Sequence, residues 1–431
     1  MIEAYHLRLA GQRGACMRRR IPALLAAIVL GLGLTPGPVH AAPRASVSAG
    51  GGVVAPPRFD FASARAAADP ETQARIAAIA ALLPENWQAM LADKRERMGL
   101  KPSLVQELAA DAIDPSLYQC QDTQFTTYTQ GLLEGVDLDT LLVLLIFGVL
   151  DYAAYDALIY GQPNNEADYG LPASHKSTLK RTFKDAQQFW DVDLFDVKLM
   201  AMQNDMLQDP ARVARMVSFI WGVDEDQAAA VAAEIMAIID SVPALDGGRN
   251  PIFTLNAFAF TTEGETDPLL RDVPDKVVYG EGMLTAIGAL GLGTAGTRAI
   301  LAHEMAHHVQ FEQGLLDSPL TGAEATRRTE LMADAFGTYF VTHQRGLNFN
   351  GVQIHQAQQT FYEVGDCFFD DPGHHGTPNQ RLRASVWGAQ VAQQATGTRP
   401  ILPSLNLFNR FERKLPALIK PDARPEPAGR L

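Results

Sequence analysis

The spacing of apolar residues predicts that the first half of the chain is almost entirely helical. Apolar side chains recur there at intervals of three and four residues, which is the period of an amphipathic helix. The segments with this period are 71–83, 85–98, 138–150, 181–208 and 210–241, the last divided by a turn at 223–226. Pro210 stands where helices commonly begin, since the first turn needs no N–H from it. Segment 119–128 is polar and rich in threonine, and its pattern is ambiguous.

Segment 138–150 is the most apolar part of this region. From Leu141 it holds ten consecutive apolar or glycine residues, and Asp139 and Asp151 bound it. As a helix these ten residues span about 15 Å, half the thickness of a bilayer core. The pattern therefore favours a buried helix, and a membrane segment is the alternative.

The pattern changes after a turn cluster at 246–251, where the sequence is Asp-Gly-Gly-Arg-Asn-Pro. Segment 252–262 alternates in the manner of a strand, and 276–279 predicts a second strand. Helices are then predicted at 295–313, 325–340 and 379–395. The order of elements predicts an α+β fold that is predominantly helical, with an N-terminal helical region over 71–245 and a small β-sheet within a second domain over 246–395.

The first 41 residues have the composition of an export signal. Three arginines at 18–20 precede an apolar run over 21–34, and Val-His-Ala at 39–41 ends in a small-residue cleavage site. Cleavage there predicts a periplasmic or secreted protein; Met17 is an alternative start, and an uncleaved signal anchor is the alternative outcome. Residues 42–70 are expected to form a disordered leader and 396–431 a loosely held tail.

Composition narrows the classes of partner. The 431 residues are 47% hydrophobic and 20% charged, which is ordinary for a globular protein. The formal net charge of −13 argues against binding to nucleic acid or to an anionic membrane surface.

Cysteine usage predicts one disulfide. Cys16 leaves with the signal, so Cys120 and Cys367 remain, an even number in an oxidising compartment. We expect them to be bonded to each other; two separate buried thiols are the alternative.

The run His303-Glu-Met-Ala-His307 carries the most specific chemistry in the chain. It has the form HExxH, and positions i and i+4 lie on one face of a helix, so both imidazoles can reach one metal ion. Zinc held in this way keeps an open position for water, and Glu304 can take a proton from that water. The motif predicts a zinc hydrolase with one ion per chain.

A later helix supplies a third metal ligand. Glu330 and Asp334 lie one turn apart, and two carboxylates at this spacing repel each other unless a cation neutralises them. We predict that Glu330 completes the zinc site and that Asp334 accepts the free ring N–H of a ligating histidine.

These residues resemble the gluzincin metallopeptidases, whose pattern is HExxH followed on a later helix by ExxxD. Residues 256–260 (Asn-Ala-Phe-Ala-Phe) and 277–284 resemble two strands of the prenyl-protease-type branch of that group. Residues 375–381 resemble its His…Arg element, although Gly376 stands where that branch usually has proline. The resemblance covers roughly residues 250–390 and does not reach the N-terminal half.

The resemblance implies a zincin-like endopeptidase that hydrolyses peptide or protein substrates, with Glu304 as general base. His375 is the implied oxyanion donor, with His374 and Tyr339 in reserve, and Arg381 is expected to order the loop of His375. The strand at 277–281 is a candidate edge for an extended peptide. Two alternatives stay open: a non-catalytic or latent zinc-binding periplasmic chaperone or scaffold, and a membrane-associated metalloprotease.

A glycine motif typical of nucleotide-binding sites also occurs in the chain. Residues 291–296 fit GxGxxG, but no apolar strand follows the helix they open, so no βαβ unit is predicted. We therefore expect no nucleotide cofactor and interpret the glycines as a turn close to the metal site.

Overall fold

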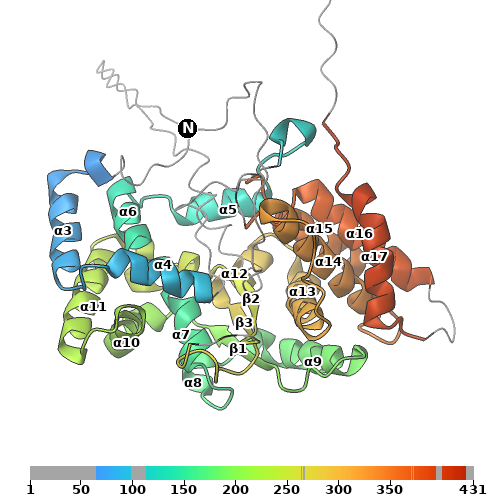
Figure 1. Ribbon diagram of the computed structural model, residues 1–431, viewed down its shortest axis with the longest axis horizontal. Helices are drawn as coiled ribbons and strands as arrows, with labels where there is room; N and C mark the ends of the chain where they lie inside the picture. The colour runs from blue at the N-terminus through green and yellow to red at the C-terminus, as the bar shows by residue number, and fades with distance from the viewer. Residues whose placement is uncertain are drawn as a thin grey trace, which may run out of the picture.

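The computed structural model describes residues 65–98, 113–263, 265, 267–369, 371, 373–394 and 400–423. The predicted signal segment, with its alternative start, and most of the predicted leader lie outside these residues. Within them the protein is predominantly helical with a single three-stranded sheet (Figure 1). The predicted α+β class, mainly helical, is therefore confirmed.

The N-terminal half contains nine of the helices described. They are α3 (Pro70–Ala81), α4 (Trp87–Arg97), α5 (Gln124–Leu132), α6 (Leu138–Ile146), α7 (Tyr152–Tyr160), α8 (Glu166–Tyr169), α9 (Ala173–Phe189), α10 (Pro210–Trp221) and α11 (Glu225–Asp240). Polar N-caps begin several of them: the Asp209 side chain accepts hydrogen bonds from the first turn of α10, and Asp224 does so for α11. The break between α10 and α11 lies at the predicted turn.

The C-terminal half contains α12 (Glu281–Ala289), α13 (Gly293–Glu312), α14 (Gly322–Thr342), α15 (Gly351–Glu363), α16 (Pro378–Gln394) and α17 (Ser404–Leu418). The predicted helices at 295–313, 325–340 and 379–395 correspond to α13, α14 and α16. Helix α12 ends at Ala289, just before the GxGxxG segment, which therefore joins α12 to α13. Gly291 and Gly293 both have positive φ there, as the predicted turn requires.

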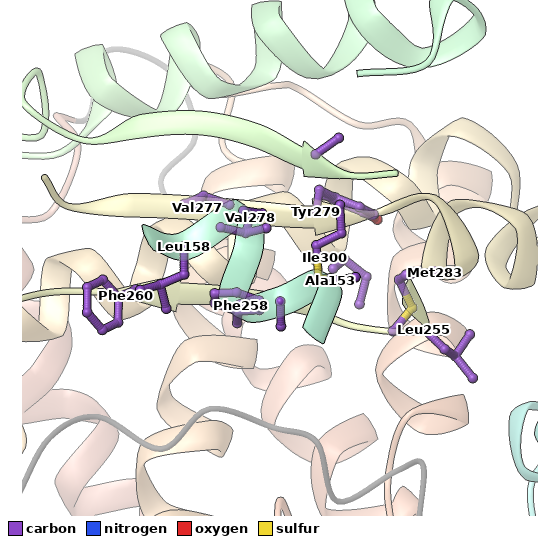
Figure 2. Packing of buried hydrophobic residues seen from close by; sticks show 14 of the residues in the cluster. Ala153, Leu158, Leu255, Phe258, Phe260, Val277, Val278, Tyr279, Met283 and Ile300 are labelled. Atoms are coloured by element: carbon purple, nitrogen blue, oxygen red, sulfur yellow. The ribbon is translucent and has the colours of Figure 1, made fainter. Parts of the chain in front are cut away.

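The sheet has the strand order β1-β3-β2, with β1 (Lys198–Met202) parallel and β2 (Ala257–Phe260) antiparallel to the central β3 (Lys276–Gly280). Two layers of helix cover it. Lys276 Nζ donates to Gly161 O just beyond α7 at 2.9 Å, and Tyr279 Oη donates to Thr297 O of α13 at 3.3 Å. Because side chains alternate along a strand, α7 covers one face and α13 the other (Figure 2).

Two predicted elements on this sheet were wrong. The helix predicted over 181–208 ends with α9, and Lys198–Met202 forms the strand β1. The Leu, Met and Ala residues of this strand favour a helix locally, but pairing with β3 overrides that preference. The strand predicted to begin at 252 begins at Ala257. Before it, Pro251–Thr254 forms the 3-10 turn η5, capped by Asn250.

The C-terminal tail was also predicted wrongly. Residues 404–418 form α17, which packs against α14 and α16. Its buried residues recur at helical spacing, and they are Leu407, Phe411, Leu415 and Leu418. Arg328 on α14 adds an ion pair of 2.8 Å to Glu412. An apolar stripe of this length is enough to hold the segment on the core.

The apolar segment at 138–150 forms α6 and the short turn η2 (Val149–Asp151), and most of its side chains are buried in the core. Among the described residues no single helix is long and apolar enough to cross a membrane. Two bent pairs reach the required length and composition only when taken together: Leu138–Ile146 with Val149–Tyr160, and Glu225–Asp240 with Pro243–Thr254.

The Sγ atoms of Cys120 and Cys367 lie at disulfide distance, 1.97 Å. The pair joins the segment before α5 to the loop that carries His374 and His375, across 247 residues of sequence. Ile113 and Phe369 pack beside it, and Ile113 N donates to Phe369 O at 3.0 Å. The N-terminal half is thus attached to the loop beside the predicted metal site.

Lys276→Met is expected to change the pH dependence of stability. Burial lowers the pKa of Lys276 to about 8 in the folded protein, against 10.5 when exposed. Between these values the unfolded chain binds more protons, so the free energy of unfolding rises with pH in the wild type, by at most about 3 kcal/mol. Urea denaturation of both proteins between these two pH values measures the effect. The free energy of unfolding of the wild type should rise with pH relative to that of the variant. A constant difference would contradict the lowered pKa.

Candidate metal centre

Helices α13 and α14 hold the HExxH and ExxxD residues against each other. They approach closely because Gly337 of α14 faces the backbone of α13, where a Cβ atom would lie 3.0 Å from His303 N. On the far side of α14, a Cβ atom at Gly388 of α16 would lie 2.1 Å from Ala335 O. Three helices therefore stack with little space between their backbones, and the polar residues between them are buried.

Three predicted ligands converge on one point. His303 Nε2 and His307 Nε2 lie 3.0 Å apart, and the Glu330 carboxylate oxygens lie 3.2 Å and 3.5 Å from them. Ligand atoms around one zinc ion, with bonds of about 2.0–2.2 Å, have separations of roughly this size. Glu304 lies on the same side, and its carboxylate and the two histidine nitrogens are within 4.8 Å of one another.

The other ring nitrogen of each histidine is already engaged. His303 Nδ1 donates to Asp334 Oδ1 at 2.9 Å, as predicted. His307 Nδ1 donates to Gln310 Oε1 at 2.9 Å, while the amide nitrogen of Gln310 donates to Thr329 O. Both Nε2 atoms therefore face the centre, from where imidazole nitrogen can bind a metal ion. Gln310 was not predicted, although its place three residues after a ligand was a usable signal.

Arg381 holds Asp334 in place. Its Nε and Nη2 atoms donate to the two carboxylate oxygens of Asp334 at 2.8 Å each, and Nη2 lies 3.7 Å from Glu330 Oε2. A bidentate pair of this kind is the strongest geometry available to a buried arginine. Arg381 therefore fixes the carboxylate that orients His303, in addition to donating to Val364 O next to the loop.

The electrostatics of the centre separate the roles of its residues. Burial lowers the pKa of His303, but hydrogen bonds to Asp334 and Glu330 raise it overall to about 10, whereas burial lowers the pKa of His307 to about 4. Burial alone would raise the pKa of Glu330, yet the nearby histidines hold it below its usual range. Burial raises the pKa of Glu304 to about 8. Protons and a metal ion compete for the same nitrogen atoms.

Asp366 positions the two histidines of the loop. His375 N and Nδ1 both donate to Asp366 Oδ2, at 2.8 and 3.1 Å, and His374 Nδ1 pairs with Asp366 Oδ1. Of the two rings, only that of His375 lines the pocket over the metal centre. Burial alone would lower the pKa of His375, but Glu330 and Asp366 raise it. Asp366 was not predicted, because nothing in its spacing marks it.

The two alternative candidates for the oxyanion donor, Tyr339 and His374, lie away from this pocket. Tyr339 is buried in an aromatic cluster with Phe189 and Trp190, and its hydroxyl accepts a hydrogen bond from Leu402 N. The expectation that it could stabilise an oxyanion was therefore wrong, because its side chain points away from the metal ligands into the core. His374 stacks on Phe369 outside the pocket.

The pocket over the centre is lined by both polar and apolar side chains. Its polar lining is the set His303, Glu304, His307, Glu330, His375 and Arg381, with Asn256. Its apolar lining is Phe125, Leu255, Ala257, Phe258, Met283, Ile300 and Val364.

The strand beside the pocket is β2 and not β3. The segment predicted as a free edge, 277–281, contains most of β3, which is paired on both sides and cannot accept another strand. This expectation was wrong because β1, the third strand, went unrecognised in the sequence. β2 has β3 on one side only, and its residues 257 and 258 line the pocket.

The chain matches no family model, no curated protein and no solved structure in comparisons with all three. The chemistry of the centre therefore has to be argued from its own residues.

Glu330→Ala is expected to lower zinc affinity by at least about 100-fold, because only the two histidines would remain as ligands. Loss of a residue that merely hydrogen-bonds to a ligand typically costs about 10–100-fold. Glu324→Gln, on the same helix but outside the pocket, is the matched control. Calorimetric titration with zinc and elemental analysis after dialysis measure the effect. Full affinity in the alanine variant would refute the assignment of Glu330 as a ligand.

Proposed function

We propose that this protein is an exported zinc-dependent endopeptidase with a zincin-like catalytic region. The observation that carries the proposal is the convergence of two histidine Nε2 atoms and the Glu330 carboxylate within 3.0–3.5 Å, with Glu304 beside them and a pocket above. The resemblance of residues 250–390 to the gluzincins agrees with this arrangement. The Cys120–Cys367 pair supports export, since disulfides persist in oxidising compartments.

The donor set fits zinc, which prefers imidazole nitrogen and carboxylate oxygen in a four-coordinate site with one open position. When bound, the ion would polarise the substrate carbonyl and lower the pKa of a water molecule towards about 7. Glu304 is oriented to accept the proton of that water and to return it to the leaving amine. Its raised pKa, which a neighbouring cation would lower again, suits a group that must both take and give a proton near neutral pH.

His375 is placed to donate to the oxygen that becomes negative when the carbonyl is attacked. Its Nδ1 atom is held by Asp366, which leaves Nε2 as the nitrogen free to donate into the pocket. For Nε2 to donate while Nδ1 also donates, the ring must carry both protons, and the adjacent Asp366 carboxylate stabilises that form. One such donor is typically worth about 3–4 kcal/mol in the transition state.

An extended peptide along the free edge of β2 would pass over the metal centre. Backbone hydrogen bonds to the strand would supply affinity and set the register of the scissile bond. Asn256 and Ala257, where β2 begins, lie in the pocket lining beside the metal ligands.

Glu304→Gln is expected to keep zinc and lose at least about 100-fold in hydrolysis, since the amide cannot accept the proton of water. The test is mass-spectrometric analysis of a mixed peptide library incubated with zinc-loaded protein. Glu312→Gln, two turns further along α13 and outside the pocket, should cleave like the wild type. Equal cleavage by the Glu304 variant, or none by any protein with zinc bound, would overturn the proposal and favour a non-catalytic or latent zinc protein.

Asp366→Ala is expected to lower kcat by about 100-fold with little change in KM, because His375 loses the carboxylate that orients and charges it. Asp366→Asn keeps an acceptor without the charge and should recover part of the loss. Asp371→Asn is the control: Asp371 lies in the same loop, and its Oδ1 atom accepts from Gly373 N. A change in KM alone would show that Asp366 acts on substrate binding and not on the donor.

A further inference from the structure

Among the residues that the structure describes, Phe125 is the one member of the pocket lining from before residue 250. It lies near the start of α5, outside the part of the sequence that resembles the gluzincins, and its side chain is buried. Helix α5 packs against both η5, which leads into β2, and α15, whose end carries Val364 (Figure 1). It therefore lies across the cleft between these two elements.

Several contacts fix Phe125 in this position. Glu363, the last residue of α15, receives two of them: its backbone oxygen accepts from Thr123 Oγ1 at 2.7 Å, and its Oε2 atom accepts from Phe125 N at 3.2 Å. Gln359 Nε2 donates to the other carboxylate oxygen at 2.8 Å. The Cys120–Cys367 disulfide holds the same segment five residues earlier. The ring of Phe125 is thus part of a built wall and not of a mobile loop.

Among the described residues, the wall that Phe125 forms with Val364, Leu255 and Met283 is apolar. Figure 2 shows Leu255 and Met283 close together beside the start of β2, and both line the pocket. The one guanidinium in the lining, Arg381, is bound on two atoms by Asp334. A charged side chain entering here would lose its hydration without gaining a partner, whereas an apolar one gains about 0.8 kcal/mol for each buried methylene.

We propose that Phe125 is a specificity-determining residue, forming with Val364, Leu255 and Met283 a subsite that receives an aliphatic or aromatic side chain next to the scissile bond. The inference rests on the proposed endopeptidase function and names its substrate class. A peptide extended along β2 directs alternate side chains to opposite sides, so one of those flanking the cleaved bond points into this subsite. The N-terminal helical half thus contributes directly to substrate selection.

The test compares peptides that differ at one position flanking the cleaved bond, carrying Ala, Leu, Phe or Asp. The wild type should prefer Leu or Phe over Asp and Ala. Phe125→Leu and Phe125→Ala enlarge the subsite, so the ratio of kcat/KM for Phe over Leu should rise about tenfold, within the 10–200-fold range of apolar pockets. Because a ratio on one preparation does not depend on the amount of folded enzyme, partial misfolding of Phe125→Ala leaves it interpretable.

Tyr128→Leu is the matched control, since Tyr128 lies one turn along α5 and outside the pocket lining. It should keep the wild-type ratio. Unchanged ratios in both Phe125 variants, or a wild-type preference for Asp, would overturn the subsite. If the wild type cleaves no peptide, calorimetric binding of the same peptides to zinc-loaded protein separates the two proposals: affinity that follows Phe125 retains the subsite without hydrolysis, and affinity indifferent to it removes the subsite as well.

Discussion

The structure depends on the pairing of buried charge around Asp334. This carboxylate has no exposure, and an unpaired charge at such a depth would cost several kcal/mol. Arg381 of α16 supplies two hydrogen bonds to it and His303 of α13 a third, so three helices are joined through one side chain of α14. The rotation of each helix about its axis is thereby fixed, and with it the direction in which every ligand points. Removing either partner of Asp334 would leave this buried carboxylate with fewer hydrogen bonds.

The candidate metal ligands could be grouped from the sequence because local periodicity encodes each pair. His303 with His307, and Glu330 with Asp334, lie at i and i+4, and that spacing alone places each pair on one helix face. The joining of the two faces is a long-range fact, yet only one arrangement neutralises two adjacent carboxylates. Gln310 belongs to the same class of local signal and was overlooked. The stripe of Leu407, Phe411 and Leu415 in α17 was likewise present in the sequence.

The remaining features could not be found in this way. β1 is composed of residues with a helical preference, and only its partner β3 makes it a strand. Without β1, β3 looked like an edge, and the strand available to a peptide was misassigned. Phe125 lines the pocket from a helix far away in sequence, and Asp366 holds His375 from within a loop, so no spacing rule connects either residue to the ligands. Such positions are determined by packing and are visible only once the chain is folded.

The parallel pairing of β1 with β3 bears on how the proposed activity could be inhibited. A common way to restrain a hydrolase is a detachable N-terminal segment that is cut off when activity is needed. Here residues 198–202 form a strand of the central sheet, and the segment before α5 is bonded to the loop beside the metal ligands. Excision of this half would remove a strand, one wall of the cleft and a covalent cross-link together. On the proposed function, this half is part of the catalytic region and is therefore not a detachable restraint.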